Sequence, residues 1–202
     1  MSFLENTRKP VGLGGKLMVS LMNLGHSPVA WWGLRFLNVA PDAKVLDCGC
    51  GGGANIKRLL KKCPQGIVKG IDYSPVSVEK SQRVNADAIA KGRCTILQGS
   101  VAKRIFAEGW FDAVTAFETV YFWPELPQCF HEIHRMLKPG GMFLICNESS
   151  GDTDKDEKWT KIIDGMTIYK DVELKADLEQ VGFRDVQIHK NKWDWLCVTA
   201  RK

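Results

Sequence analysis

Residues 45–53, which read VLDCGCGGG, constrain the fold of this chain more than any other stretch. A short apolar run ends in Asp47, and the glycines that follow are too dense for a helix interior. A buried parallel strand that turns sharply into a helix at a ligand site has this pattern. Because glycine lacks a Cβ atom, a ligand can lie against the main chain there. The stretch therefore predicts a nucleotide-like ligand at the turn.

The glycine spacing alone leaves two kinds of ligand open. Gly49, Gly51 and Ala54 also satisfy the pattern G-x-G-x-x-G/A of dinucleotide-binding folds. Asp47 favours the other reading, because a carboxylate there can accept from N–H groups of the turn and reach a cationic ligand, but would repel a pyrophosphate. S-adenosylmethionine is a cationic ligand of this kind, because it carries an ammonium and a sulfonium, so an aspartate at this position suits it. Asp72 supports the fold more than the ligand, since nicotinamide-binding folds also carry an acid about 20 residues further on.

At this point the sequence resembles the class I S-adenosylmethionine-dependent methyltransferases. Their first motif, D/E-x-G-x-G-x-G, is matched by Asp47, Gly49, Gly51 and Gly53. Three later motifs follow in the family's order: a second-strand end at residues 70–74, an F-D-x-V fourth strand at 111–118, and an L-K-P-G-G turn from 137. The pattern is most similar to the small-molecule branch typified by ubiquinone-biosynthesis and type 11 enzymes.

This resemblance implies an α/β fold with a Rossmann-like, seven-stranded, mostly parallel sheet, helices on both faces and a terminal antiparallel hairpin. Apolar patterning predicts strands at residues 44–47, 66–71, 94–97, 111–117 and 142–146, and a hairpin from 183–189 and 193–199. It predicts helices at 54–62, 75–91, 127–137 and 172–181. The charged residues 152–157 are predicted to be an exposed loop or the edge of a lid.

We expect a single domain, with residues 1–40 as an N-terminal helical cap and 41–202 as the methyltransferase domain. The cap is predicted to contain helices near residues 13–24 and 28–36. Such a segment resembles the variable helices that class I methyltransferases place over the cleft as a lid.

Composition narrows the class of partner. The seven cysteines are scattered and contain no C-x-x-C pair, so neither a disulfide framework nor a zinc site is indicated, and no metal site is expected. A net charge of +5 without a dense basic run argues against a nucleic-acid substrate. The sequence contains no apolar stretch long enough for a membrane span, and its start lacks the apolar core of a secretory signal. A cytoplasmic location is therefore expected. The oligomeric state stays open.

The resemblance also implies a set of cofactor-binding residues. Main-chain atoms of Gly49, Cys50 and Gly51 would lie against the methionine and ribose moieties, Asp47 would order that loop or reach the ammonium, and Asp72 would accept from both ribose hydroxyls. Ser100 stands where many family members have an aspartate that contacts the adenine amino group. The remaining residues predicted on the cofactor side are Tyr73, Gly99, Val101, Phe117 and Glu118.

Methyl transfer from a sulfonium depends mainly on in-line positioning, so few catalytic residues are expected. His26 is the best-placed histidine for a general base near neutral pH, against a competing role in capping or packing. Tyr121 belongs to three consecutive aromatics after Glu118 and faces either the substrate or the core. Glu148 and Tyr169 lie where family substrates often pass. A nicotinamide-dependent oxidoreductase and a non-catalytic S-adenosylmethionine-binding partner subunit remain as alternatives.

Overall fold

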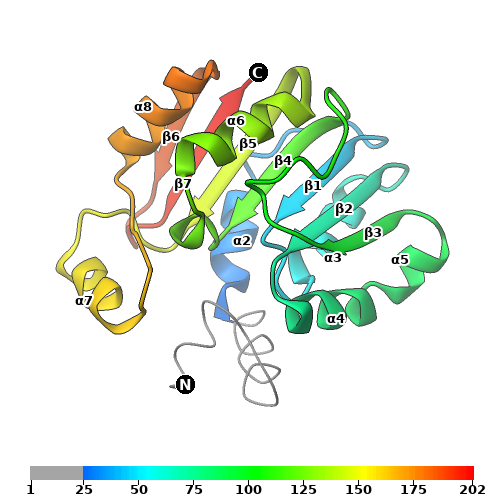
Figure 1. Cartoon of the computed structure of the whole chain (residues 1–202), viewed down its shortest axis with the longest axis horizontal. Coiled ribbons are helices and arrows are strands. Elements are labelled where there is room, and N and C mark those ends of the chain that lie inside the picture. The colour runs from blue at the N-terminus through cyan, green and yellow to red at the C-terminus, as the bar shows by residue number, and fades with distance from the viewer. Residues whose placement is uncertain (1–24) are drawn as a thin grey trace.

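A computed structural model describes residues 25–202, so the helix predicted near residues 13–24 lies outside the described residues. The sheet has seven strands in the order β3-β2-β1-β4-β5-β7-β6 (Figure 1). Its strands are β1 (Lys44–Cys48), β2 (Ile67–Asp72), β3 (Cys94–Gln98), β4 (Phe111–Phe117), β5 (Leu137–Asn147), β6 (Arg184–Lys190) and β7 (Leu196–Arg201). The first five are mutually parallel, and β7 runs antiparallel to both β5 and β6. The predicted fold class is confirmed.

The strand order reverses at β1. The chain runs outward from β1 to β2 and β3, and then returns to the other side of β1 as β4 and β5. In open α/β sheets the crevice at the carboxyl ends of the strands on either side of such a reversal is the usual ligand site. The turns that follow β1, β2, β4 and β5 meet at this edge.

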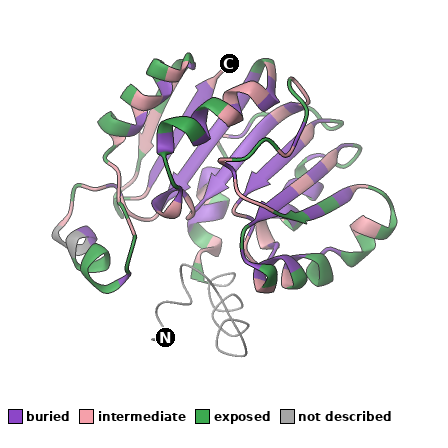
Figure 2. Cartoon of the chain, viewed as in Figure 1, coloured by how far each residue is buried: buried purple, intermediate pink, exposed green. Residues whose placement is uncertain are grey.

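Helices cover both faces of the sheet, and its central strands are buried, whereas the edge strands β3 and β6 are partly exposed (Figures 1 and 2). One face packs against α6 (Leu126–Met136) and α8 (Asp171–Val181). The other face packs against α2 (Ser27–Gly33), α3 (Ala54–Lys62), α4 (Pro75–Val84) and α5 (Ala86–Ala90). A short 3₁₀ helix, η2 (Val120–Phe122), follows β4. None of the helices within residues 25–202 is both long and apolar enough to cross a membrane.

Several bounds differ from the sequence prediction, since β5 begins at Leu137 instead of 142 and β7 at Leu196 instead of 193, and two segments differ in the elements they form. The helix predicted over 75–91 breaks at Asn85, whose buried side chain donates to the carbonyls of Gly53 (3.1 Å) and Ser81 (2.9 Å). This amide ties the end of α4 to the turn before α3, and α5 begins anew after it. The prediction of an exposed loop at 152–157 was wrong, because α7 (Asp154–Ile162) begins there with a capping box between Thr153 and Asp156. The alternative role of this segment as the edge of a lid stays a prediction.

The second predicted N-terminal helix is present as α2, which is shorter than the 28–36 expected. Gly33 ends it against β5, where a Cβ atom would lie 2.5 Å from Cys146 Sγ. Trp32 packs on Phe36 and Trp195, so this part of the segment is held against the terminal hairpin. The boundary predicted at residue 40 and the lid role of the segment stay predictions.

Candidate active site

The turn between β1 and α3 is held to the end of β2 by hydrogen bonds. The N–H groups of Gly49 and Cys50 both donate to the carbonyl of Ile71, at 2.8 and 3.0 Å. The N–H of Gly51 donates to Asp72 Oδ2 at 2.9 Å. The predicted residues of the turn are therefore brought together with Asp72, and hydrogen bonds within the protein hold the shape of the turn.

Two glycines of this turn have different surroundings, although both have a positive φ (71° at Gly49 and 49° at Gly51). A Cβ atom on Gly49 would lie 2.0 Å from Thr119 Oγ1, so the turn packs tightly against the segment after β4. Among residues 25–202, no atom lies within 4 Å of where a Cβ atom on Gly51 would be. With respect to this part of the chain, Gly51 therefore presents bare main chain, which is what a cofactor lying along the backbone requires.

The carboxylate of Asp72 is buried at the end of β2. Oδ1 accepts from the N–H of Ser74 at 2.9 Å, while Oδ2 accepts from Gly51. Burial raises the pKa of Asp72, and these two hydrogen bonds oppose the shift. Each carboxylate oxygen keeps a further lone pair. Acceptance from two ribose hydroxyls is compatible with this geometry and stays a prediction.

Asp47 is fully enclosed at the end of β1, with 1% of its surface exposed. Thr115 Oγ1 donates to its Oδ1 at 2.7 Å. Burial raises the pKa of Asp47 to about 7, and the charge of Asp72 adds to the shift, whereas the Thr115 hydrogen bond and Arg58 oppose it. The bond that orders the glycine turn comes from Asp72, so for Asp47 the prediction that remains is the contact with a cationic group.

The other residues predicted on the cofactor side surround this turn in part. Gly99 donates its N–H to the carbonyl of Asp72 at 2.9 Å, which brings the segment after β3 to the predicted ribose site. Ser100 Oγ accepts from the N–H of Ala102 at 3.3 Å. Tyr73 is 39% exposed, whereas Val101 and Phe117 are buried within the two core clusters. Their roles toward a cofactor stay predictions.

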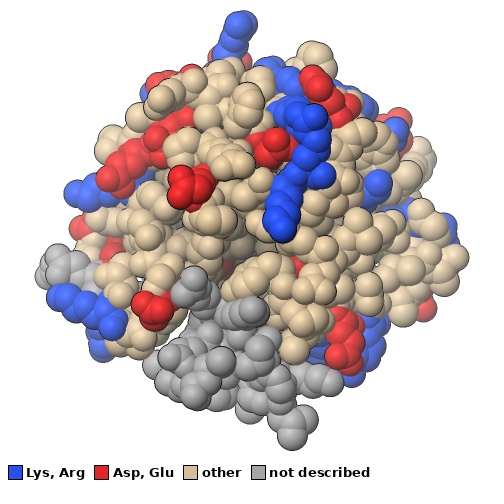
Figure 3. All heavy atoms as spheres, in the orientation of Figure 1, with Lys and Arg blue, Asp and Glu red and all other residues tan. Residues whose placement is uncertain are grey.

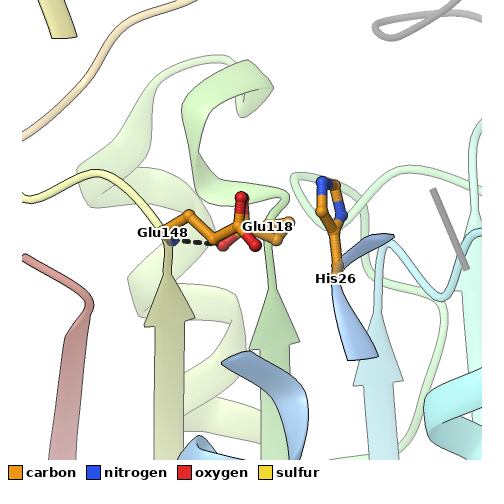
Figure 4. A group of neighbouring side chains, drawn as sticks. All are labelled: His26, Glu118 and Glu148. Carbon is orange, nitrogen blue, oxygen red and sulfur yellow. Dashed lines mark hydrogen bonds between the residues drawn. The ribbon is translucent and has the colours of Figure 1, made fainter. Parts of the chain in front are cut away.

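Glu118 directs its side chain into a hydrogen-bonded network at the ends of β4 and β5 (Figure 4). Its backbone has a φ of 55°, and its N–H donates to the carbonyl of Cys146 at 2.9 Å. Its carboxylate accepts from the N–H of Glu148 and is hydrogen-bonded to the Tyr121 side chain. The N–H of Ser149 donates to the Tyr121 hydroxyl at 3.1 Å. Tyr121 therefore supports Glu118 from a buried position.

His26 lies beside these two glutamates at the start of α2. It occupies the position before the first helical residue, but its side chain makes no capping hydrogen bond. Ligand atoms of His26, Glu118 and Glu148 all lie within 4.8 Å of one another. Burial lowers the pKa of His26, which keeps the imidazole neutral near pH 7. Glu118 was predicted on the cofactor side and no metal site was expected, because no local sequence pattern links three residues so far apart in the chain.

A fixed glycine turn, buried acids at the ends of β1 and β2, and a reversal of strand order define a cofactor-binding α/β protein of the Rossmann-like kind. Residues 46–145 match a family model described as a methyltransferase domain. Cycloartenol-C-24-methyltransferase 1 of Oryza sativa subsp. japonica is 33% identical over 109 residues, which cover 54% of this chain and 31% of the relative. The 24-methylenesterol C-methyltransferase 3 of Arabidopsis thaliana is 28% identical over 162 residues, which cover 75% and 44%.

Among solved structures, a SAM-dependent methyltransferase from Aquifex aeolicus superposes with a TM-score of 0.76 at 18% identity, over 92% of this chain and 97% of that one. The chain belongs to the class I S-adenosylmethionine-dependent methyltransferases, and S-adenosylmethionine is the cofactor of this family. It spans less than half the length of the two curated relatives described above.

Proposed function

We propose that this protein transfers the methyl group of S-adenosylmethionine to a small-molecule acceptor. The observation that carries the proposal is the turn at residues 49–53, which Asp72 holds in a shape that exposes the main chain of Gly51. The family match covers this turn and the strands around it. The same match favours methyl transfer over the nicotinamide-dependent alternative.

The residues present fit the cofactor. Asp72 would accept from the ribose hydroxyls, and the open face of Gly51 would receive the ribose and methionine chain. Asp47 lies behind the turn as a buried carboxyl, and a further cation nearby would favour its charged form; the cofactor's ammonium is such a cation. The bound cofactor supplies an activated methyl group with a good neutral leaving group. The task left to the protein is to orient the acceptor in line and to exclude water.

The acceptor would lie on the side of the site formed by β4, β5 and the start of α2. Tyr121 fixes the Glu118 carboxyl there, and His26 offers the lone pair of a neutral imidazole. That lone pair can receive either the acceptor's proton or a cation. The names of the two relatives refer to cycloartenol and to a 24-methylenesterol, so a sterol-like molecule is one candidate acceptor among several small-molecule classes.

We further propose that the acceptor is not a nucleic acid and that the protein works in the cytoplasm. On the face shown in Figure 3, acidic and basic side chains are interspersed instead of forming one continuous basic stripe. All seven cysteines are buried free thiols, a state that suits a reducing compartment.

Incubation with methyl-labelled S-adenosylmethionine and a panel of sterols, amines, phenols, thiols and quinones tests the proposal. We expect label to appear in one chemical class of acceptor, and to be lost in Asp72→Ala. Tight binding of S-adenosylhomocysteine without transfer to any acceptor would favour the non-catalytic partner instead. Absence of binding would overturn the proposal.

A further inference from the structure

Three side chains that can donate to a metal converge at the carboxyl edge of the sheet from three separate elements. His26 comes from the start of α2, Glu118 from the end of β4 and Glu148 from the end of β5 (Figure 4). Their ligand atoms lie within 4.8 Å of one another. Ions such as Zn²⁺ hold nitrogen and oxygen ligands at about 2.0–2.2 Å, so small side-chain rotations would close the three around one ion.

Glu118, the central donor of the three, is positioned by its surroundings. Glu118 is fixed by the hydrogen bonds from the Glu148 N–H and the Tyr121 side chain, which leave further carboxylate lone pairs for another partner. Tyr121 is held in turn by the N–H of Ser149. Outer hydrogen bonds of this kind orient the ligands of metal sites. His26 occupies the cap position of α2, and its ring makes no capping hydrogen bond, so capping does not use its lone pair.

Electrostatics also favours a cation at this place. Glu118 and Glu148 are both partly buried, and the Glu118 carboxylate accepts from the Glu148 N–H. Two neighbouring carboxyl groups and an imidazole together offer oxygen and nitrogen electron pairs to one ion. A divalent ion would offset the repulsion between the two glutamates and use the imidazole lone pair at the same time.

We propose that His26, Glu118 and Glu148 form a binding site for a divalent metal ion of the Mn²⁺ or Zn²⁺ class. Mixed imidazole and carboxylate donors suit these ions. The site adjoins the cofactor turn, because Thr119, the residue after Glu118, contacts Gly49 closely. Three protein ligands leave coordination positions to which an oxygen of the acceptor can bind. That use of the ion rests on the proposed function, whereas binding of the ion does not.

Metal binding is tested on the full, untagged chain after removal of metal with a chelator. Mn²⁺ is titrated into the protein and the free ion is followed by electron paramagnetic resonance, with Zn²⁺ as a competitor. We expect one Mn²⁺ per chain, displaced by Zn²⁺. His26→Ala and Glu148→Gln should each weaken binding about tenfold or more, the usual effect of disturbing a metal site. His131→Ala, an exposed histidine on α6, serves as the matched control and should bind as the wild type does.

Glu148→Gln is the sharper of the two variants, because the backbone N–H that bonds to Glu118 remains. Thermal melting and S-adenosylhomocysteine affinity of each variant establish that it is folded. Absence of stoichiometric Mn²⁺ or Zn²⁺ binding by the wild type, or equal affinity in His26→Ala, Glu148→Gln and the control, would overturn the metal site. Loss of S-adenosylhomocysteine binding with metal binding intact would count against the proposed function alone.

Discussion

Replacing Asp47 by asparagine should stabilise the protein without ligand, and more so as the pH rises. The pKa of Asp47 is about 7 in the folded chain, against an ordinary value of 3.8, chiefly because the group is buried. Between these values the folded state keeps a proton that the unfolded chain has released. The free energy of unfolding of the wild type therefore falls as the pH rises toward 7, and it levels off above that pH.

The magnitude follows from the shift. Between about pH 5 and pH 7 the folded state holds the extra proton over about two pH units, and each unit corresponds to about 1.4 kcal/mol. The asparagine side chain has no charge to bury and still offers an amide oxygen to the Thr115 hydroxyl. The stability of Asp47→Asn relative to the wild type should therefore increase by up to about 3 kcal/mol between about pH 5 and about pH 8.

Urea unfolding at the two pH values, followed by fluorescence, measures this difference. Asp112→Asn is the control. Burial raises the pKa of Asp112, but the hydrogen bonds from Lys138 and from the Lys44 N–H outweigh it and leave the pKa below its ordinary value. Its stabilising contribution is lost only when the pH falls below about 4, so the cost of Asp112→Asn should be the same at both pH values. Parallel curves for Asp47→Asn and the wild type would refute the reasoning.

Three further experiments probe the site. Asp72→Ala should weaken S-adenosylhomocysteine binding by about 1–3 kcal/mol in calorimetry, and Asp72→Asn by less; unchanged affinity in both would remove Asp72 from the site. Gly49→Ala should destabilise the fold by more than Gly92→Ala in thermal melts. Both glycines have a positive φ (71° and 69°), but of the two only Gly49 has a described neighbour, Thr119, where the new Cβ atom would lie. Equal losses of stability would contradict this packing argument. Hydrogen exchange across residues 25–36 should slow when S-adenosylhomocysteine binds if this segment is a lid, and identical exchange would make it scaffold.

Most of the sheet and its helices could be predicted from the sequence, because local patterns are strong there. Both the α3 helix and the β4 strand begin and end at the predicted residues. The break at Asn85 could not be predicted, since it depends on a hydrogen bond to a residue 32 positions away. The start of α7 had a local signal, Thr153 three residues before Asp156, which was outweighed by the charge of the segment.

The candidate site divides in the same way. The glycine turn and Asp72 could be predicted as parts of a cofactor site, because each belongs to a motif of residues that are adjacent in the sequence. The motif does not reveal which acid orders the turn, because Asp47 and Asp72 lie at the ends of neighbouring strands. Only the register of β1 with β2 decides which of the two accepts from the Gly51 N–H. The group of His26, Glu118 and Glu148 has no local signature, since it exists only once α2, β4 and β5 are packed together.

Calorimetric titration with S-adenosylhomocysteine, paired with the same titration of NADH, tests the central claim most directly. The turn at residues 49–53, with Asp72 behind it, predicts one S-adenosylhomocysteine bound per chain and no heat with NADH. A native-state ligand raises the melting temperature by mass action, so a shift should accompany the binding. Binding of NADH, or neither heat nor a melting shift at saturating S-adenosylhomocysteine, would contradict the assignment of this protein as a methyltransferase.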